Sequence, residues 1–237
     1  MFERVKEPRE RLIVALDVPS AAAAMKIAAT VGHSAGTYKV GMQLYTAEGP
    51  PIVRDLISAG HGIFLDLKYH DIPNTVASAV RAAGALGVNM LTVHAAGGRK
   101  MLRAAVEAGR EANPALKILA VTVLTSMNDE DLNRIGVPGT TADQVLRLGA
   151  MALSSGCQGV IASAHEATEL RRKLGHDFLI VTPGVRPAGT DVGDQARVAT
   201  PAEAIAAGAT HIVVGRPITG ADDPAIAAKS ILREIAA

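Results

Sequence analysis

The sequence predicts an α/β fold in which eight parallel strands close into a barrel surrounded by helices. Short β-branched runs alternate with Ala-rich helical stretches along all 237 residues, and this alternation implies parallel strands because each crossover carries a helix. The runs are continuously apolar, as expected for strands that are buried on both faces. Eight strands exceed the roughly five or six of an open doubly wound sheet, which favours a (β/α)8 TIM barrel. Because no linker or break in composition appears, we expect one domain over residues 1–237.

The expected strands are the short apolar runs of the chain, and a helix is expected after each of them. The strands cover residues 12–18, 38–41, a stretch from 62, 90–94, 117–124, 159–163, 178–184 and 211–215. The helices cover about 20–31, 51–59, 74–84 and 101–111, a stretch ending near 154 after a polar connection at 125–139, then 165–174, a stretch from 201, and 224 to the end. Ser20 is the expected cap of the first helix. Thr200-Pro201-Ala202-Glu203 matches a capping box with Pro at the first helical position.

The composition excludes several classes of protein. The net charge is +1 and aromatic residues make up 3% with no Trp, so nothing favours binding to nucleic acid. No apolar run approaches the roughly 20 residues of a membrane span, and the charged first residues lack the apolar core of a signal peptide. Cys157 is the only cysteine, which rules out an internal disulfide and indicates a reducing compartment. We therefore expect a cytoplasmic protein in which Cys157 is a small buried side chain.

The third strand ends in a cluster of charged residues. Asp66, Lys68 and Asp71 fall within six residues, just before Pro73 turns the chain towards a helix. Alternate side chains of an extended strand share a face, so Asp66 and Lys68 are expected to leave it together. Charges at the end of a buried strand are costly unless they pair with one another or carry a function. Taken alone, the stretch fits a structural salt bridge as well as a catalytic cluster.

The ends of other strands also carry polar residues. Active sites of (β/α)8 barrels lie at the carboxyl ends of the strands. The residues found there are Asp17, Lys39, Asp66, Lys68, His94, Thr125 and Arg216. Two acids alternating with two lysines form a network that favours protonated lysines, and a protonated lysine on a rigid strand can act as a general acid. Because lysines repel a cation, we expect no metal site.

The remaining histidines are expected to have other roles. His61 and His211 precede their strands and would lie at the opposite, stabilising end of the barrel. His33, His165 and His176 fall in turns or at helix ends, where solvent exposure is expected. His70 stays unassigned.

The loops after the seventh and eighth strands predict a phosphate site. Pro183-Gly184-Val185-Arg186 and Gly215-Arg216 follow these strands, and barrels of this kind often hold a phosphate there with backbone N–H groups. Gly215 permits close approach of the backbone and Arg216 offers a bidentate partner. The alternative is that these are turn glycines with solvated arginines. No Walker or dinucleotide-binding spacing is present in the sequence.

Taken together, these motifs resemble the orotidine 5′-phosphate decarboxylase family over nearly the whole chain. The matching stretches are Ala15-Leu16-Asp17, Lys39-Val40-Gly41, Asp66 to Thr75, Val93-His94-Ala95, Leu124-Thr125-Ser126, Thr182 to Arg186, Asp194 to Val198 and Val213 to Arg216. The Asp-x-Lys-x-x-Asp core alone is shared with related sugar-phosphate decarboxylases and synthases. The resemblance implies a barrel of the ribulose-phosphate-binding type.

The resemblance also implies a reaction: decarboxylation of orotidine 5′-phosphate to UMP and CO2, the last step of de novo UMP synthesis, without a cofactor or metal. Lys68 would protonate C6 of the pyrimidine, with Asp66, Asp71 and Lys39 completing the catalytic group. Asp71 and Thr75 would reach the site of the neighbouring subunit in a homodimer. The implied substrate contacts are Asp17 near the ribose, Thr125 and Ser126 at the pyrimidine, and Arg186, Gln195, Gly215 and Arg216 at the phosphate. His94 and Pro183 complete the expected binding residues. The loop from 185 to 199 is the expected lid.

Two alternatives to this activity are open. One is another phosphosugar decarboxylase or an aldolase of the same barrel group, many of which use a metal. The other is a non-catalytic barrel that binds a phosphorylated ligand.

Overall fold

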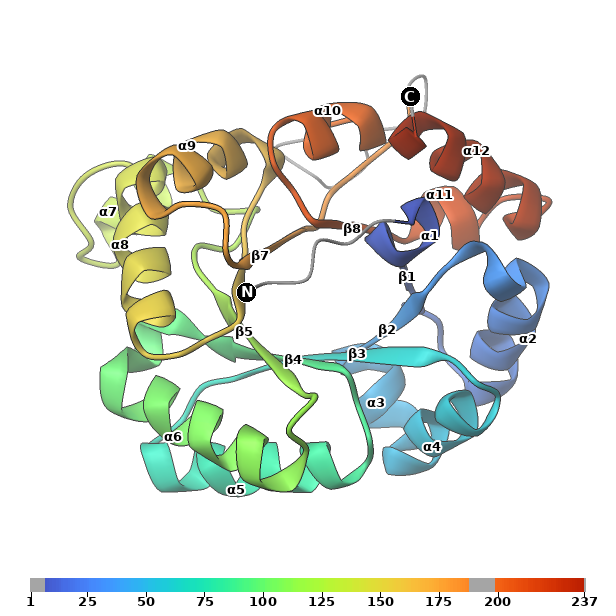
Figure 1. Ribbon diagram of the computed structural model, residues 1–237, viewed down its shortest axis with the longest axis horizontal. Helices are drawn as coiled ribbons and strands as arrows, with labels where there is room; N and C mark the ends of the chain where they lie inside the picture. Colours follow the sequence, from blue (N-terminus) through green and yellow to red (C-terminus); the bar gives the residue numbers. More distant parts are fainter. Residues whose placement is uncertain (1–6, 188–198, 237) are drawn as a thin grey trace.

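The computed structural model describes residues 7–187 and 199–236. Eight parallel strands form a closed barrel in which each strand pairs with its neighbours in chain order, and β8 pairs with β1 (Figure 1). The strands are β1 (Leu12–Ala15), β2 (Thr37–Gly41), β3 (Gly62–Tyr69), β4 (Met90–His94), β5 (Lys117–Val121), β6 (Gly159–Ile161), β7 (Leu179–Thr182) and β8 (His211–Val214). The prediction of a (β/α)8 barrel is confirmed.

Helices surround this barrel on all sides in Figure 1. Those described are α1 (Pro8–Arg11), α2 (Ala21–Val31), α3 (Met42–Glu48), α4 (Pro50–Ser58), α5 (Pro73–Ala85), α6 (Gly98–Ala112), α7 (Asp129–Arg134), α8 (Thr141–Ser154), α9 (Ala164–Leu174), α10 (Pro201–Ala206), α11 (Arg216–Thr219) and α12 (Pro224–Ala236), with 3-10 turns at Gly32–Ser34 and Ala95–Gly97. The expected strict alternation is wrong in detail, since α1, α3, α7 and α11 are additional. Each spans only four to seven residues, which is too short for a helical apolar period to show.

The predicted starts of the helices agree with the structure where a cap was identified. The Ser20 hydroxyl accepts a hydrogen bond from the Ala23 N–H at 3.3 Å, and α2 begins at the next residue. Thr200 and Glu203 form the expected reciprocal capping box at the start of α10. Pro73 is the first residue of α5.

Several strands end earlier than their apolar runs predicted. The first run was expected to extend to residue 18 and the fifth to 124, but β1 ends at Ala15 and β5 at Val121. Leu16 and Val123 lie beyond these ends and are still buried, with 0% and 7% of their surface exposed. Leu16 still donates its N–H to the Lys39 carbonyl of β2 at 2.9 Å, and the burial of both side chains accounts for the apolar character of these segments beyond the strand ends.

Two apolar cores hold the barrel together. The larger core lies between the strands and the helices, and a smaller one fills the interior. The interior core consists of Ile13, Ala15, Phe64, Met90, Leu119, Leu179, Val181 and Val213. At Gly159 on β6, a Cβ atom would lie 2.5 Å from the Leu179 Cβ, so only glycine lets β6 and β7 approach this closely. The filled interior forces any ligand site to lie at an end of the barrel.

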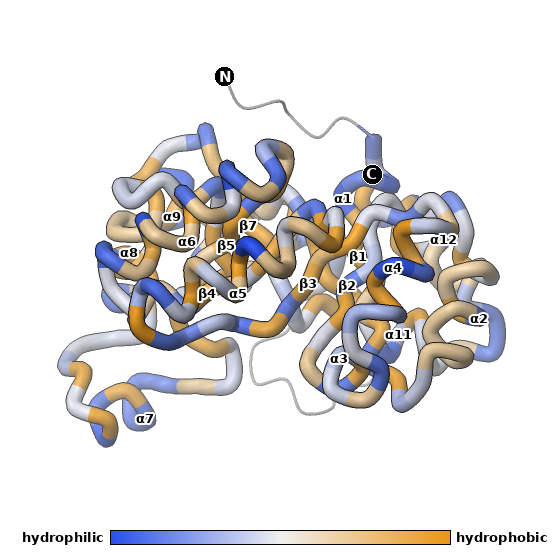
Figure 2. The backbone as a smooth tube through the Cα atoms, turned by 90° about the horizontal axis from the view of Figure 1, so that it is seen from below, coloured by the Kyte–Doolittle hydropathy of each residue, from blue (hydrophilic) through white to orange (hydrophobic). Residues whose placement is uncertain are grey.

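The two ends of the barrel differ in the groups that they carry. Figure 2 shows α1 on one side of the strands and α7 on the other. His211 opens β8 and is buried with 5% exposed, and His61 packs edge-on against Tyr38 with ring centroids 4.7 Å apart. Both histidines precede the strand bodies, as predicted for the stabilising end. His33, His165 and His176 are exposed, also as predicted.

The single cysteine lies in the apolar interior of the protein. Cys157 is buried with 6% exposed, and burial raises the pKa of its thiol to about 12, which agrees with the expected small apolar role. Of the helices described, none combines the length and apolarity needed to cross a membrane.

Candidate active site

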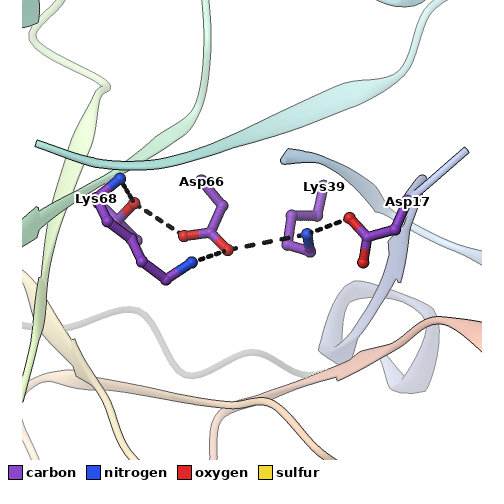
Figure 3. Close-up of polar contacts among 5 residues, drawn as sticks. Asp17, Lys39, Asp66 and Lys68 are labelled. Carbon is purple, nitrogen blue, oxygen red and sulfur yellow. Dashed lines mark hydrogen bonds and ion pairs between the residues drawn. The ribbon is translucent and has the colours of Figure 1, made fainter. Parts of the chain in front are cut away.

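Four charged side chains form a continuous network at the carboxyl ends of β1, β2 and β3. Lys68 Nζ donates to Asp66 Oδ2 at 2.8 Å, and Lys39 Nζ donates to Asp17 Oδ1 at 2.8 Å. Lys39 Nζ also lies 3.8 Å from Asp66 Oδ2, which links the two pairs. Figure 3 shows the acids and lysines in alternation. The network expected from the ends of the strands is therefore present.

Most of this network is shielded from solvent. The Lys39 and Asp66 side chains are 11% and 12% exposed, Lys68 is 25% exposed, and Asp17 reaches solvent at 55%. Buried charges are tolerated only when partners compensate them. Because acids and lysines alternate, each buried group faces an opposite charge, and the ammonium group of Lys68 is held in place rather than moving freely in water.

An irregularity in β3 places Lys68. Leu65 pairs with Leu91 but Tyr69 pairs with Val93, so four steps along β3 match two along β4. Within this bulge Lys68 has φ +52°, and it is the only non-glycine residue with a positive φ in the described part of the chain. Such a backbone costs on the order of 1–2 kcal/mol in a residue with a side chain. Asp66 and Lys68 do meet as predicted, but through a bulge and not through the alternation of an extended strand.

Thr92 on β4 is the residue that the sequence reasoning missed. It is fully buried, its hydroxyl accepts from the Lys68 N–H at 2.9 Å, and the same hydroxyl donates to Asp66 Oδ1 at 2.9 Å. A signal was present in the pattern of β4, because Thr92 lies two residues after Met90 and therefore on the same face of the strand, and the Met90 side chain joins the interior core. A hydroxyl facing the barrel interior two residues before His94 indicates a polar partner there.

Gly41 makes room for the network at the end of β2. A Cβ atom at this position would lie 2.8 Å from Lys39 Nζ and 2.9 Å from Asp17 Oδ1. Its φ of −95° is open to any residue, so the need for glycine comes from space and not from backbone conformation. The absence of a side chain at Gly41 therefore lets the Lys39–Asp17 pair form.

A cavity of about 160 Å³ opens beside the network. Its lining combines charged and polar groups with an apolar wall: Lys39, Phe64, Asp66, Lys68, Val121, Val123, Leu124, Thr125, Ile161, Val181, Pro183 and Val213. The apolar wall lowers the local dielectric, which strengthens the interaction of the Lys68 ammonium group with any negative charge that develops in the cavity.

Asp71 and Thr75 lie apart from this network. Both are exposed, and the Asp71 carboxylate accepts a hydrogen bond from the Ile72 N–H at 2.6 Å. Among residues 7–187 and 199–236, Asp71 forms no ion pair. The neighbouring Ile72 is 67% exposed. Within one chain these side chains do not complete the site.

His94 lies at the end of β4, close to the network but not in the lining of the cavity. Its ring centroid is 5.3 Å from that of the exposed His70. Burial lowers the pKa of His94, the charges of His70 and Lys68 lower it further, and Asp66 acts in the opposite direction. The net effect of these surroundings is to favour the neutral form of the His94 ring.

The expected phosphate residues lie after β7 and β8. Arg186 is buried with 8% exposed, its N–H donates to the Ala199 carbonyl, and Val185 pairs with Ala199 in a parallel bridge. The two ends of the loop expected as a lid are thus held together. Gln195 and most of that loop, residues 188–198, lie outside the described residues.

The other expected binding residues are distributed around the same end of the barrel. Gly215 caps the short helix α11, and Arg216 is its exposed first residue. Pro183 and Thr125 line the cavity, and Ser126 is exposed next to Thr125. In the described part of the chain, no three His, Cys, Asp or Glu side chains gather as a group of metal ligands.

Comparisons with known proteins agree with this geometry. Residues 10–231 match the model of the "Orotidine 5′-phosphate decarboxylase / HUMPS family". The orotidine 5′-phosphate decarboxylase of Halorhodospira halophila is 54% identical over 227 residues, 96% of either chain, and that of Moorella thermoacetica is 51% identical over 96% of this chain and 92% of its own. The crystal structure of orotidine 5′-phosphate decarboxylase from Lactobacillus acidophilus superposes with a TM-score of 0.86 at 42% identity, covering 96% of this chain and all of that one.

Proposed function

The chain belongs to the orotidine 5′-phosphate decarboxylase / HUMPS family, and on that basis we propose that it converts orotidine 5′-phosphate to UMP and CO2 with Lys68 as the proton donor. The observation that carries the proposal is the Lys68 ammonium group, ion-paired to Asp66 at 2.8 Å and facing a cavity with an apolar wall. The family is one of decarboxylases, so the chain is an enzyme of this class.

The proposed chemistry follows from the charge of Lys68. When the bond between C6 and the carboxylate carbon breaks, its electron pair stays on C6 and CO2 leaves. A fixed ammonium group beside C6 stabilises this negative charge, and it does so most strongly where water is excluded. A proton then passes from Lys68 Nζ to C6, which yields UMP, and the neutral amine regains a proton from solvent.

Asp66 and Lys39 hold Lys68 in its place in this proposal. Asp66 Oδ2 accepts from Lys68 and lies 3.8 Å from the Lys39 ammonium group. A carboxylate next to the substrate's own carboxylate disfavours the bound ground state and so favours the loss of CO2. Lys39 keeps the buried charges in balance.

Binding of the substrate is assigned to residues around the cavity. We propose that Asp17 and Lys39 contact the ribose and that Thr125 and Ser126 contact the pyrimidine. The phosphate would be held by Arg186, Gln195, Gly215 and Arg216, with Pro183 and His94 bordering the substrate. Phosphate binding far from C6 can provide the free energy that orients the reacting carbon.

A homodimer with shared sites is part of the proposal. Asp71 and Thr75 are exposed and unconnected to the network of their own chain, which suits a role in the site of a neighbouring subunit. The exposed Ile72 between them is apolar and would be buried in such a contact. The homodimer and a cytoplasmic location both remain predictions.

The test is direct turnover of orotidine 5′-phosphate without added metal or cofactor. The pyrimidine absorbance changes when C6 loses its carboxylate, so the reaction can be followed in a spectrophotometer, with UMP confirmed by chromatography. We expect steady loss of absorbance that a chelator leaves unaffected. Absence of turnover would refute the proposed function.

The same assay addresses the alternatives. A phosphosugar decarboxylase or aldolase that needs a metal would leave orotidine 5′-phosphate unchanged and would lose its own activity with a chelator. A binding protein without catalysis would bind UMP and show no change in absorbance.

A further inference from the structure

One threonine hydroxyl connects the two catalytic side chains of β3. Thr92 lies on β4, 26 residues from Asp66 and 24 from Lys68 in sequence. Its Oγ1 is 2.9 Å from the Lys68 backbone nitrogen and 2.9 Å from Asp66 Oδ1. Thr92 is fully buried, so no water competes for these contacts at its own surface.

The direction of both hydrogen bonds follows from the chemistry of the groups. A backbone N–H can only donate, so the Thr92 oxygen accepts from Lys68. An ionised carboxylate can only accept, so the single hydroxyl proton of Thr92 points at Asp66 Oδ1. The hydroxyl therefore cannot rotate to another partner without losing one of the two contacts.

In this arrangement the two carboxylate oxygens of Asp66 have different partners. Oδ1 is occupied by Thr92, and Oδ2 faces both Lys68 Nζ at 2.8 Å and Lys39 Nζ at 3.8 Å. Without Thr92 the carboxylate could turn about its terminal bond, because that torsion is broad in aspartate. The oxygen that holds the Lys68 ammonium group would then no longer be fixed.

Thr92 also supports the unusual backbone of Lys68. Lys68 has φ +52° within the β3 bulge, where the regular ladder to β4 is interrupted. At this interruption the Thr92 oxygen accepts a hydrogen bond from the Lys68 N–H at 2.9 Å, which satisfies this backbone group. A strained residue persists only where its surroundings hold it.

We propose that Thr92 is a positioning residue of the reaction: through Asp66 Oδ1 and the Lys68 N–H it sets where the Lys68 ammonium group lies. This inference rests on the proposed function, since it assumes that Lys68 acts on the substrate. Thr92 is absent from the lining of the cavity, so it acts through Asp66 and Lys68 and does not touch the substrate.

The test compares Thr92→Val, which keeps the shape and loses the hydroxyl, with Thr92→Ser, which keeps the hydroxyl. Loss of a hydrogen bond to a charged group predicts a fall in kcat of about 10- to 100-fold for Thr92→Val. KM and the affinity for UMP should stay within about threefold, because the removed contact is not made to the substrate. Thr92→Ser should keep kcat close to that of the wild type.

A second threonine provides a matched control. Thr122 follows β5, is also buried, and donates its hydroxyl to the Ile161 carbonyl at 2.8 Å, without contact to Asp66 or Lys68. Thr122→Val therefore removes one buried hydrogen bond of the same kind, and it should leave kcat unchanged. If it lowers kcat as far as Thr92→Val does, a general loss of packing explains both and the inference is wrong.

Other results with the Thr92 variants would overturn the positioning role. A Thr92→Val enzyme with the wild-type kcat, or equal losses in Thr92→Val and Thr92→Ser, would overturn the positioning role. If Thr92→Val does not fold, Thr92→Ala against Thr92→Ser makes the same comparison, since both lack the methyl group and only serine keeps the hydroxyl. A wild-type protein without turnover would refute the proposed function itself, and the role of Thr92 with it.

Discussion

At the scale of single residues, the site depends on how the ammonium group of Lys68 is held. Lys68 Nζ pairs with Asp66 at 2.8 Å, its backbone is left-handed, and its side chain is three-quarters buried. Each feature limits the motion of the charge. In the proposed reaction, a charge already in position needs little reorganisation when negative charge develops at C6, and such preorganisation is the main source of electrostatic catalysis.

The first prediction concerns the removal of that charge. Lys68→Ala should lower turnover of orotidine 5′-phosphate by at least about 10²-fold, since it removes the proposed proton donor and its stabilising charge. UMP should still bind in calorimetry, because Asp66 keeps Thr92 and Lys39 as partners. Lys229→Ala, at an exposed position on α12, is the control and should be as active as the wild type. Rapid turnover by Lys68→Ala would exclude Lys68 as the donor.

His211 links pH to stability at the opposite end of the barrel. Burial lowers its pKa to about 4, and the nearby charges of Lys117 and Arg11 act in the same direction. The folded state therefore holds His211 neutral, while the unfolded chain takes up a proton near pH 6.5. This contribution to stability is complete above about pH 6.5 and is lost as the pH falls from there towards 4.

The second prediction concerns this loss of stability as the pH falls. Between pH 7 and pH 4 the wild type should lose roughly 3 kcal/mol of unfolding free energy through His211, from a pKa difference of about 2.5 units. His211→Gln should show a correspondingly smaller loss when urea unfolding is measured across this range. His176→Gln, at an exposed position, should follow the wild type. Parallel curves for His211→Gln and the wild type would contradict the assignment.

At the scale of the elements, the junction between β2 and α3 shapes the network. β2 ends at Gly41 and α3 begins at Met42. The space beside Gly41 is filled by Lys39 Nζ and Asp17 Oδ1, both within 2.9 Å of where a Cβ would lie. Glycine at Gly159, by contrast, allows β6 to approach Leu179 of β7. Gly41 thus leaves space for the charged network, whereas Gly159 allows two strands to pack closely.

The third prediction compares the effects of alanine at Gly41 and at Gly159 on activity and on stability. Gly41→Ala should displace the Lys39–Asp17 pair and lower kcat/KM by about 10- to 100-fold, since small misplacements of catalytic groups are costly. Its melting temperature should change little, because φ −95° suits alanine. Gly159→Ala should instead lower the melting temperature, because its Cβ would meet the Leu179 Cβ and carbonyl oxygen at 2.5 Å. The same effect on activity and stability in both variants would contradict this distinction.

At the scale of the whole molecule, the closed barrel collects residues from distant parts of the chain at one end. Asp17 follows β1, Lys39 and Asp66 lie on the next two strands, and Val181 on β7 and Val213 on β8 also line the cavity. Asp71 is the acid of the motif that this assembly leaves exposed. A second copy of the chain is the proposed recipient of its charge. That residues 1–237 form one domain stays a prediction.

The fourth prediction tests the shared site by mixing inactive chains. In a twofold dimer, a hybrid of Lys68→Ala and Asp71→Ala subunits has one intact site and one doubly damaged site. Equal mixing with free exchange should therefore restore about a quarter of the wild-type activity. A mixture of Lys68→Ala with Asp66→Asn is the control, since no hybrid of these two has an intact site. No recovery despite demonstrated exchange would argue against sharing.

Several features could be predicted because they depend on local patterns. The apolar runs and helical stretches repeat along the chain, and the count of eight runs predicted the barrel. Because parallel strands have their carboxyl ends on the same side, the polar residues at these ends were predicted to gather at one end of the barrel. The caps at Ser20 and Thr200 were predicted because capping depends on residues three apart. The burial of Cys157 and the position of His211 at the start of β8 also agreed with expectation.

What the sequence determined by itself is the barrel, the end at which the charges gather, and the alternation of Asp17, Lys39, Asp66 and Lys68. Only the tertiary structure decided how Lys68 is held. The bulge in β3, the hydrogen bonds of the Thr92 hydroxyl and the approach of Asp17 to Gly41 all involve residues more than 20 positions apart in the sequence. Local periodicity carries no information on such contacts, because it records which side of a strand is buried and not which neighbour lies there.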